Sequence, residues 1–264
     1  MSLHEYLQAD PQCLRLLEGA VRAVGPMLED PDPGPVETVV AGWAHDLAGR
    51  MPLPWTFHGG VDALNHYLFQ EVGLHGDRET YDDPANAALP RVLERKRGMP
   101  ISLSILWLEV ARRLGFQAIG VSLPGHFITG LQMDVGTLYY DPFGGGRSLG
   151  EEEAAWLVEQ STGGRAVFQR SMLAPVPNRM ILARLVRNLH VRFLRTGNWD
   201  EALWTSTHLV LLQPGDSASF RDRAFVHFKR GEMAPGLADL QEAIRLSPED
   251  DPELTQWMER LRRE

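Results

Sequence analysis

Three polar residues stand in an order that suits nucleophilic catalysis: Ser102, His126 and Asp141. A serine hydroxyl attacks only when a base in contact takes its proton, and a histidine held by a carboxylate is such a base. Two readings remain open. Ser102 is either a nucleophile or a first-turn serine that bonds the free N–H groups of its own helix. His126 is either a catalytic base or a structural histidine bonded to Asp141.

Hydrophobic spacing predicts the elements around these residues. Apolar side chains cover most of the circumference of residues 100–114, which predicts a buried helix that begins at Pro100 and ends at Gly115. Ser102 is therefore expected in its first turn. The period then changes to two. This change predicts three short strands at residues 117–123, 126–133 and 137–143.

The connection between the last two strands decides whether His126 and Asp141 can meet. Directly paired residues of antiparallel strands share a face, so these two face the same way only if paired numbers have an odd sum. A two-residue loop at Asp134-Val135 gives a sum of 269 and sets Asp141 opposite Ile128. A loop centred on Val135 alone gives 270 and points the two side chains to opposite faces. We predict the odd sum.

The chain before the buried helix is expected to be helical, with intervening loops. Residues 36–50 and 61–72 follow helical spacing. Asp83 and Asn86 are expected to cap the next helix. Residues 1–177 are therefore predicted to form an α+β domain, with a helix-rich lobe, one buried helix and a small antiparallel sheet.

The C-terminal part contains a repeat. Its period of 34 residues is that of tetratricopeptide arrays, in which a glycine permits the turn between two helices and a proline ends the second. Residues 178–264 are predicted to form such an all-α domain, and Pro252–Arg263 a capping helix. His190 departs from the pattern because a small residue is usual there. Three pairs of residues lie 34 apart: Gly197 and Gly231, Leu203 and Leu237, and Pro214 and Pro248.

The charge is unevenly distributed. The net charge is −9, and residues 178–264 hold 13 basic and 13 acidic residues, so residues 1–177 carry all of it. This balance argues against nucleic acid as a partner. Two readings remain open for the arginine-rich helix expected at residues 178–195, namely a solvated basic face or a dock for an acidic segment.

Other features exclude several classes of protein. No apolar stretch approaches 18 residues, and the first residues lack the pattern of a signal peptide, so a cytoplasmic protein without a membrane partner is expected. The histidines show no metal-ligand spacing, and no metal or cofactor is predicted. Gly144-Gly145-Gly146 lacks the Lys-Ser/Thr and helix of a phosphate loop, so it is expected to be a flexible turn.

The order of helix start, strand histidine and strand-end aspartate is that of papain-like Cys-His-Asp triads. Several segments together resemble the SirB-type transglutaminase-like family of bacterial proteins, which also carries C-terminal tetratricopeptide repeats. The resemblance covers residues 60–150 and extends through the repeats. The matching segments are Leu64-Asn65-His66-Tyr67-Leu68-Phe69, Tyr81-Asp82-Asp83-Pro84-Ala85-Asn86, Arg97-Gly98-Met99-Pro100-Ile101-Ser102-Leu103, Pro124-Gly125-His126-Phe127 and Asp141-Pro142-Phe143-Gly144-Gly145-Gly146.

The resemblance implies a catalytic cysteine at the start of the buried helix, where this chain has no thiol. The single cysteine, Cys13, is expected in an unrelated helix as a small buried apolar residue. We therefore predict a non-catalytic transglutaminase-like protein that acts by binding an unknown protein or peptide. The alternative is a hydrolase or acyltransferase that uses Ser102 with His126 and Asp141. A third reading gives the repeats a structural role only.

Overall fold

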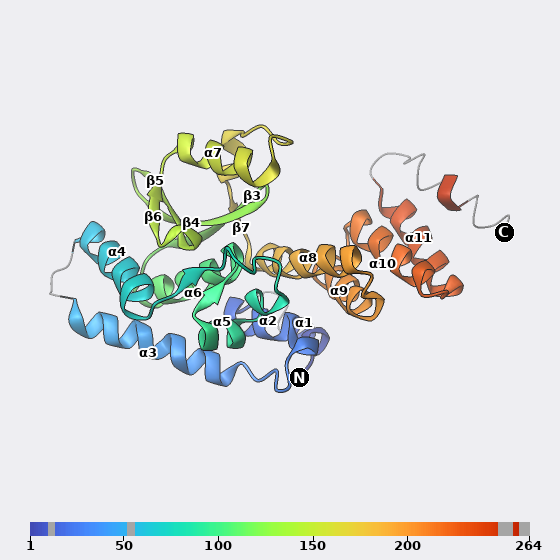
Figure 1. The fold of residues 1–264 in the computed structure, drawn as a ribbon, viewed down its shortest axis with the longest axis horizontal. Coiled ribbons are helices and arrows are strands. Elements are labelled where there is room, and N and C mark those ends of the chain that lie inside the picture. Colours follow the sequence, from blue (N-terminus) through green and yellow to red (C-terminus); the bar gives the residue numbers. More distant parts are fainter. Residues whose placement is uncertain (10–13, 52–55, 248–255, 259–264) are drawn as a thin grey trace. The chain divides into compact units, whose positions relative to one another are not determined.

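The computed structural model describes residues 1–9, 14–51, 56–247 and 256–258 (Figure 1). The chain divides into two compact units, residues 12–181 and residues 1–11 together with 182–264. The sequence predicts a domain boundary between residues 177 and 178, and the observed division differs from it in two respects. It falls four residues later, within a helix, and it groups the first eleven residues with the C-terminal helices. Cys13 lies outside the described residues.

The buried helix at the centre of the first unit is α6, Pro100–Arg113. Pro100 occupies its first turn, where the missing N–H would have no partner within the helix. Eleven of the fourteen residues are buried. The chain leaves the helix through Gly115, whose φ of +90° is a left-handed conformation that glycine adopts without strain. The sequence prediction of a central helix is confirmed.

One antiparallel sheet of five strands packs against this helix. The three predicted strands are confirmed, with ends shifted by at most two residues. The two outer strands were not predicted because three and two residues are too few to show an alternating pattern. The strands are β3 (Ala118–Leu123), β4 (His126–Met133), β5 (Gly136–Asp141), β6 (Arg147–Leu149) and β7 (Pro175–Val176), in the order β6-β5-β4-β3-β7.

The register of β4 and β5 is the predicted one. Thr129 pairs with Tyr140, and every other pair keeps the same sum of 269. Residues 134 and 135 form the connecting turn, so the even-numbered residues of β4 and the odd-numbered residues of β5 share one face. His126 and Asp141 consequently lie on the same face of the sheet.

The two faces of the sheet are covered by different helices (Figure 1). On one face, Tyr140 stacks on Trp107 of α6, with ring centroids 5.7 Å apart. On the opposite face, Val121 and Ile128 pack against helix α7, Glu151–Thr162. Since side chains alternate along a strand, the face that carries Ile128 also carries His126 and Asp141.

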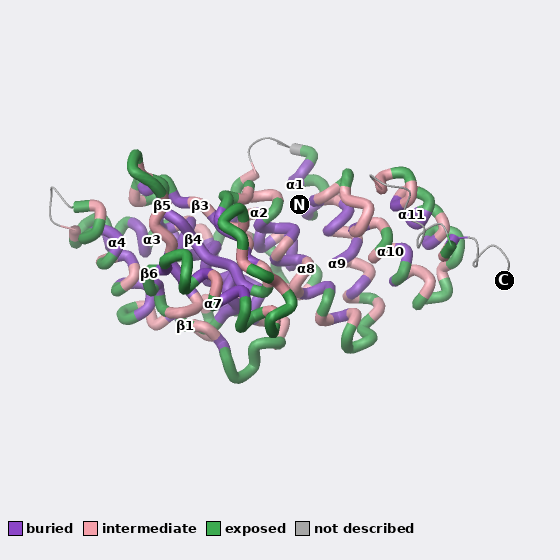
Figure 2. Tube along the Cα trace, turned by 90° about the horizontal axis from the view of Figure 1, so that it is seen from above, coloured by how far each residue is buried: buried purple, intermediate pink, exposed green. Residues whose placement is uncertain are grey.

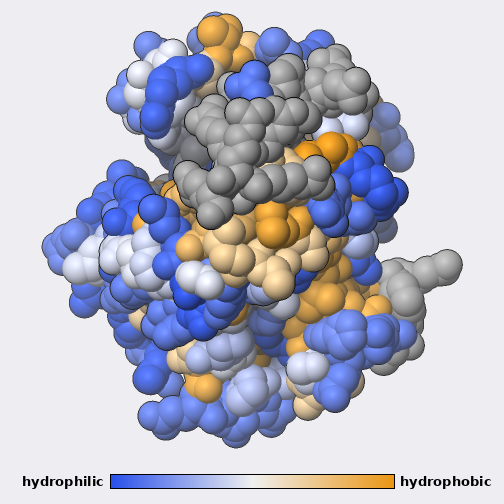
Figure 3. All heavy atoms as spheres, turned by 90° about the vertical axis from the view of Figure 1, so that its right-hand side faces the viewer, coloured by the Kyte–Doolittle hydropathy of each residue, from blue (hydrophilic) through white to orange (hydrophobic). Residues whose placement is uncertain are grey.

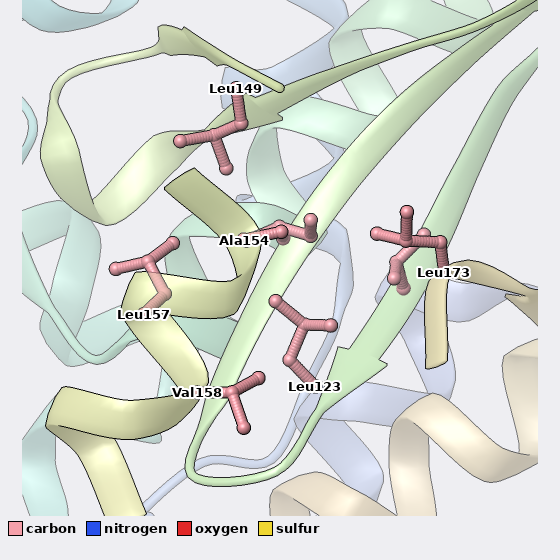
Figure 4. Packing of buried hydrophobic residues seen from close by; sticks show 8 residues of the cluster. Leu123, Leu149, Ala154, Leu157, Val158 and Leu173 are labelled. Atoms are coloured by element: carbon pink, nitrogen blue, oxygen red, sulfur yellow. The ribbon is translucent and has the colours of Figure 1, made fainter. Parts of the chain in front are cut away.

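Leucine and valine side chains of α7 and of the sheet form one apolar cluster (Figure 4). Val158 of α7 and Leu123 at the end of β3 are both fully buried in it. Buried residues follow β3 and β4 along most of their length (Figure 2). The cluster fixes α7 on the sheet, and α7 in turn forms a wall beside His126. Its members are Val121, Leu123, Ile128, Leu149, Ala154, Leu157, Val158 and Leu173.

The helical lobe completes the first unit. The predicted helix at residues 61–72 is interrupted, because α4 continues into a π-helical turn at Tyr67–Glu71. Thr56 caps α4 by accepting a hydrogen bond from the Gly59 N–H. The α-helices of the lobe are α2 (Leu16–Ala23), α3 (Gly34–Arg50), α4 (Phe57–His66) and α5 (Leu89–Arg95).

Two short parallel strands, β1 (His75–Gly76) and β2 (Arg97–Gly98), pair with each other. The chain between them forms the loop at residues 77–86 and then helix α5. Asp77 is buried and ties the start of this loop. It accepts hydrogen bonds from the N–H groups of Glu79 and Thr80 and from the Thr80 hydroxyl, at 2.6–3.2 Å. The hydrogen bond from the Thr80 hydroxyl, together with those from the backbone N–H groups, lowers the pKa of Asp77 to about 2. Burial acts in the opposite direction but is outweighed.

Asn86 ties the other end of the loop. Its side chain donates to the carbonyl oxygens of Thr80 and Tyr81, so it does not cap a helix as predicted. Asp83 does cap, because it accepts from the Ala85 N–H at 2.9 Å at the start of the 3-10 helix at residues 84–86. The Asn86 backbone carbonyl accepts from the Met99 N–H, which fixes the loop on the first turn of α6.

The second unit contains the predicted repeats. Gly197 and Gly231 have φ angles of +70° and +76° at the two helix turns. His190, which stands where a small residue is usual, is fully buried and bonds Thr205 Oγ1 at 2.9 Å. Burial lowers its pKa. The helices are α1 (Leu3–Ala9), α8 (Asn178–Thr196, which begins in the first unit), α9 (Trp199–Leu212), α10 (Ser217–Lys229) and α11 (Met233–Leu246).

The predicted capping helix at Pro252–Arg263 lies mostly outside the described residues. Of this segment, residues 256–258 are helical, and Met258 and Trp257 pack on the apolar cluster of α10 and α11. On the face that Figure 3 shows, hydrophobic (orange) residues interrupt a mainly hydrophilic (blue) surface. Within the described residues no helix is long and apolar enough to cross a bilayer.

The apolar cluster under α7 predicts a large effect of truncating Leu123. Leu123→Ala is expected to lower the free energy of unfolding by about 2–5 kcal/mol, because it leaves a cavity between α7 and the sheet. Val135→Ala is the control, because Val135 is 91% exposed at the β4–β5 turn, and its effect is expected to stay below about 0.5 kcal/mol. Urea denaturation measures both. Equal effects of the two substitutions would contradict the packing described.

The hydrogen bonds of Asp77 predict that the free energy of unfolding depends on pH. Asp77→Ala is expected to lower the free energy of unfolding by about 1–3 kcal/mol at neutral pH. The folded pKa lies below the unfolded value, so this contribution is complete above pH 3.8 and is lost as the pH falls towards 2. The difference between wild type and variant should therefore shrink in acid. Glu79→Ala, at an 88% exposed side chain, is the control. A difference that stays constant down to pH 2 would refute this role.

Candidate functional site

The structure brings two of the three candidate residues together. His126 Nε2 lies 2.9 Å from Asp141 Oδ1, and both side chains are buried, at 8% and 2% exposure. The β4–β5 register explains the contact, because it places both residues on the face covered by α7. The hydrogen bond to a carboxylate assigns the Nε2 proton to histidine, which leaves Nδ1 as an acceptor in the neutral ring.

Asp141 is held as a carboxylate. Burial raises the pKa of its carboxyl group, but the hydrogen bond from His126, the Gly144 N–H and the charge of Arg147 together lower it by more than burial raises it. The result is a pKa below the ordinary value. Arg147 Nη2 lies 3.4 Å from Asp141 Oδ2. Asp141 thus connects a histidine and an arginine through its two oxygens.

Ser102 is not part of this group. Its hydroxyl lies 2.6 Å from the Asn86 carbonyl oxygen and 3.0 Å from the Met99 carbonyl oxygen, and the side chain is fully buried. The proton of Ser102 is therefore directed at two backbone acceptors. This is neither a contact with a base nor a bond to the free N–H groups of its own helix. The hydroxyl helps to fix the 77–86 loop on α6.

A series of close contacts connects Ser102 with His126. A Cβ atom added to Gly98 would lie 2.7 Å from Ser102 Oγ, and Gly98 pairs with Gly76. A Cβ added to Gly76 would lie 2.6 Å from the Phe143 ring, which in turn makes an edge contact with His126. The two glycines permit this packing because any side chain would collide. Gly98, Gly76 and Phe143 thus form a series of contacts that runs from the serine to the histidine.

His126 and Asp141 line a pocket of about 400 Å³. Helix α7 and the loop at residues 77–86 contribute most of its other walls, and Ser102 is not among the lining residues. The volume is at the lower end of the range for small-ligand pockets. The lining residues are Arg78, Tyr81, Gly125, His126, Asp141, Phe143, Arg147, Trp156, Leu157, Gln160 and Ser161.

Two arginines and three aromatic rings line this pocket. The Arg78 guanidinium lies 5.1 Å from the Phe143 ring centroid, and the Arg147 guanidinium lies 6.0 Å from that of Trp156. The ring of Tyr81 makes an edge contact with Phe143 at 5.9 Å. Cation–π contacts orient arginine heads while their N–H edges stay free to donate.

Arg78, Arg147 and Trp156 were not predicted as site residues. Arg78 comes from the loop at residues 77–86, Arg147 from the start of β6 and Trp156 from α7. Spacing within one element cannot show that such side chains converge. Tyr81 belongs to the segment at residues 81–86 that carries the family resemblance. In that segment the sequence predicted a role only for Asp83 and Asn86, as helix caps.

The glycine-rich segment after Asp141 is an ordered turn. Gly146 donates its N–H to the Asp141 carbonyl at 2.8 Å, and its own carbonyl accepts from the Asn65 side chain at 2.9 Å. Asn65 Oδ1 in turn accepts from the Trp107 indole. The turn is thereby fixed on α6. Among the residues that the structure describes, no three His, Cys, Asp or Glu side chains group as metal ligands would.

The second unit presents a more polar hollow of about 550 Å³ at its first helix turn. The arginine-rich helix α8 directs one guanidinium into the array itself, because Arg187 pairs with Asp222 at 2.8 Å and with Asp216 at 3.5 Å. That arginine is therefore neither simply solvated nor free for an acidic partner. The residues around the hollow are Gly197, Asn198, Trp199, Asp200, Glu201 and Arg230.

Comparison with known proteins agrees with these two units. A model described as the transglutaminase-like superfamily matches residues 36–187, and one described as the tetratricopeptide repeat matches residues 189–262. No solved structure gives a significant match. Human F-box only protein 21 is 31% identical over 137 residues, which cover 49% of this chain and 21% of that protein.

Bacterial relatives match most of the chain. A UPF0162 protein of Xylella fastidiosa is 36% identical over 242 residues, covering 90% of this chain and 86% of the relative. A UPF0162 protein of Vibrio cholerae is 32% identical over 190 residues, covering 72% and 70%. The chain therefore belongs to the transglutaminase-like superfamily and, within it, to the SirB-type family of the UPF0162 proteins, with tetratricopeptide repeats in its C-terminal part.

Proposed function

We propose that this chain is a non-catalytic transglutaminase-like protein that acts by binding protein or peptide segments. The observation that carries the proposal is the position of the Ser102 hydroxyl. It is buried and bonded to two carbonyl oxygens, and it does not line the pocket that holds His126 and Asp141. A base without a nucleophile in contact has no covalent step to assist.

The sequence at the start of α6 supports the same proposal. A helix N-terminus stabilises a nearby anion by about 0.3–1 kcal/mol, which is less than one pKa unit. That effect assists a thiol, whose pKa is near 8.5, but it does not activate a hydroxyl. Residues 98–102 contain no cysteine. The local chemistry that would have served a cysteine nucleophile is therefore of no use to Ser102.

The alternative function is a hydrolase or acyltransferase that uses Ser102 with His126 and Asp141. It requires the serine hydroxyl to leave the Asn86 and Met99 carbonyl oxygens and to come into contact with His126. Each step loses hydrogen bonds or packing that the fold supplies. The preserved His126–Asp141 pair is the one observation that favours this alternative.

The repeats supply the second reason to propose a binding function. Tetratricopeptide arrays present helical surfaces to peptide segments, and the hollow lined by Trp199, Glu201 and Arg230 offers mixed polar and apolar contacts. A purely structural array is the competing reading. The proposal includes a cytoplasmic location, because one cysteine in 264 residues suits a reducing compartment.

Activity assays test the proposal directly. The full chain is expected to hydrolyse p-nitrophenyl acetate and a peptide thioester no faster than its His126→Ala variant, and to transfer no amine to a glutamine-donor peptide. The reason is the missing nucleophile beside the base. A serine-directed fluorophosphonate should leave the protein unlabelled, with an active serine hydrolase as the positive control. Turnover that His126→Ala abolishes would refute the proposal.

Ser102→Ala separates a structural from a catalytic serine. The substitution is expected to lower the free energy of unfolding by about 1 kcal/mol, because the Asn86 carbonyl loses one of its two donors. Thermal unfolding measures this loss. Ser104→Ala is a matched control, because Ser104 is equally buried on α6 but the hydrogen bond of its hydroxyl to the Phe127 carbonyl is long, at 3.4 Å. If Ser102→Ala keeps the full free energy of unfolding but changes ester hydrolysis or fluorophosphonate labelling, the result would favour the alternative function.

A further inference from the structure

We propose that the pocket beside His126 binds a peptide carboxylate that is flanked by an aromatic side chain. This inference rests on the proposed binding function and names its ligand. The pocket of about 400 Å³ accommodates one or two residues of a peptide and excludes a folded surface. The buried His126–Asp141 pair lines it together with residues of α7 and of the loop at residues 77–86.

The charge of the pocket favours an anion. Its lining contains two guanidinium groups, Arg78 and Arg147, and one carboxylate, Asp141. Asp141 is already shared between His126 and Arg147, at 2.9 and 3.4 Å. Arg78 forms no ion pair within the part of the chain that the structure describes. A local surplus of positive charge therefore exists in a unit that is acidic overall.

The surplus of positive charge in the pocket matches a carboxylate better than a phosphate. One excess positive charge balances a monoanion, whereas a phosphate ester carries nearly two negative charges at neutral pH. The second charge would be repelled by Asp141, whose lowered pKa keeps it ionised. Arginine heads also match the planar geometry of a carboxylate, with two parallel N–H donors.

The aromatic rings indicate what accompanies the carboxylate. Trp156 is 52% exposed and Tyr81 is 41% exposed, although large aromatic side chains are usually well buried. Both rings line this pocket together with Phe143. Exposed aromatic rings beside arginine are the usual anchors of peptide interfaces. They provide stacking surface for an aromatic ring next to the bound anion.

His126 contributes a third recognition element. Its Nε2 is committed to Asp141, and no hydrogen bond to Nδ1 is formed by the described residues. In the neutral ring Nδ1 accepts a hydrogen bond. A peptide N–H adjacent to the carboxylate is the ligand group that fits this acceptor. The same atom that would face a nucleophile in an enzyme thus serves for binding.

Titration of short peptides into the full ¹⁵N-labelled chain tests the inference. The probes are acetyl-Gly-Phe with a free C-terminal carboxylate, its C-terminal amide, acetyl-Glu-Phe-amide and acetyl-Gly-phosphotyrosine-amide. The readout is the Trp156 indole N–H signal, assigned with a Trp156→Phe variant. At least one of the two carboxylate peptides is expected to bind about tenfold or more tightly than the neutral amide. Comparison of these two distinguishes a chain terminus from a side-chain carboxylate.

Two variants and a matched control locate the site. Arg78→Gln and Arg147→Gln are each expected to weaken carboxylate binding at least tenfold, since each removes a charged donor. Arg91→Gln is the control, because Arg91 on α5 is exposed to a similar extent as Arg147, 51% against 48%, and does not line the pocket. Its affinity should stay within twofold of wild type. Melting temperatures verify that every variant is folded.

Several outcomes would overturn the inference. These are equal binding of acid and amide, no shift of the Trp156 signal at millimolar peptide, tighter binding of the phosphopeptide, or equal effects of Arg78→Gln and Arg91→Gln. None of them depends on turnover. A protein that is inactive and fails these titrations would retain a binding function elsewhere, whereas His126-dependent turnover would refute the proposed function itself.

Discussion

The pairing register of β4 and β5 is the constraint on which the site depends. A sum of 269 sends the side chains of His126 and Asp141 to one face and that of Tyr140 to the other. Tyr140 then stacks on α6, while the His126–Asp141 pair faces α7. A shift of one residue in this register would exchange the two faces, because side chains alternate along a strand. The two-residue turn at residues 134 and 135 thus determines which helix completes the pocket.

The loop at residues 77–86 is the second determinant of the site. It crosses from β1 to α5 and carries Arg78 and Tyr81 to the pocket, and Asp77 and Asn86 fix its two ends. The Asn86 carbonyl joins the loop to the first turn of α6 through Met99 N–H and the Ser102 hydroxyl. The serine that looked like a nucleophile in the sequence is therefore part of the scaffold that positions the pocket wall.

Local patterns in the sequence predicted most of the fold. The apolar circumference of α6, the alternation of β3, β4 and β5 and the 34-residue repeat all depend on neighbours within one element or one repeat, so they could be read directly. The odd register followed from a two-residue turn, which is also local.

The rest depended on contacts between distant segments. The π-helical turn at residues 67–71, the outer strands β6 and β7 and the grouping of residues 1–11 with the repeats have no local signal. Asn86 was misread as a cap because its carboxamide bonds backbone carbonyl groups five and six residues earlier. Arg78, Arg147 and Trp156 converge only after folding.

The buried His126–Asp141 pair needs a reason, because the Ser102 hydroxyl is directed at the Asn86 and Met99 carbonyl oxygens instead. Removing a carboxylate from water costs several kcal/mol, and replacing a buried ion pair with apolar residues often leaves stability unchanged or raises it. The proposed binding function gives Asp141 a role beyond holding the hairpin. Its partners His126 and Arg147 both line the pocket, at 2.9 and 3.4 Å from its two oxygens. The carboxylate orients one hydrogen-bond acceptor and one cation towards the same small space, and this geometry remains useful for binding even when no bond is broken.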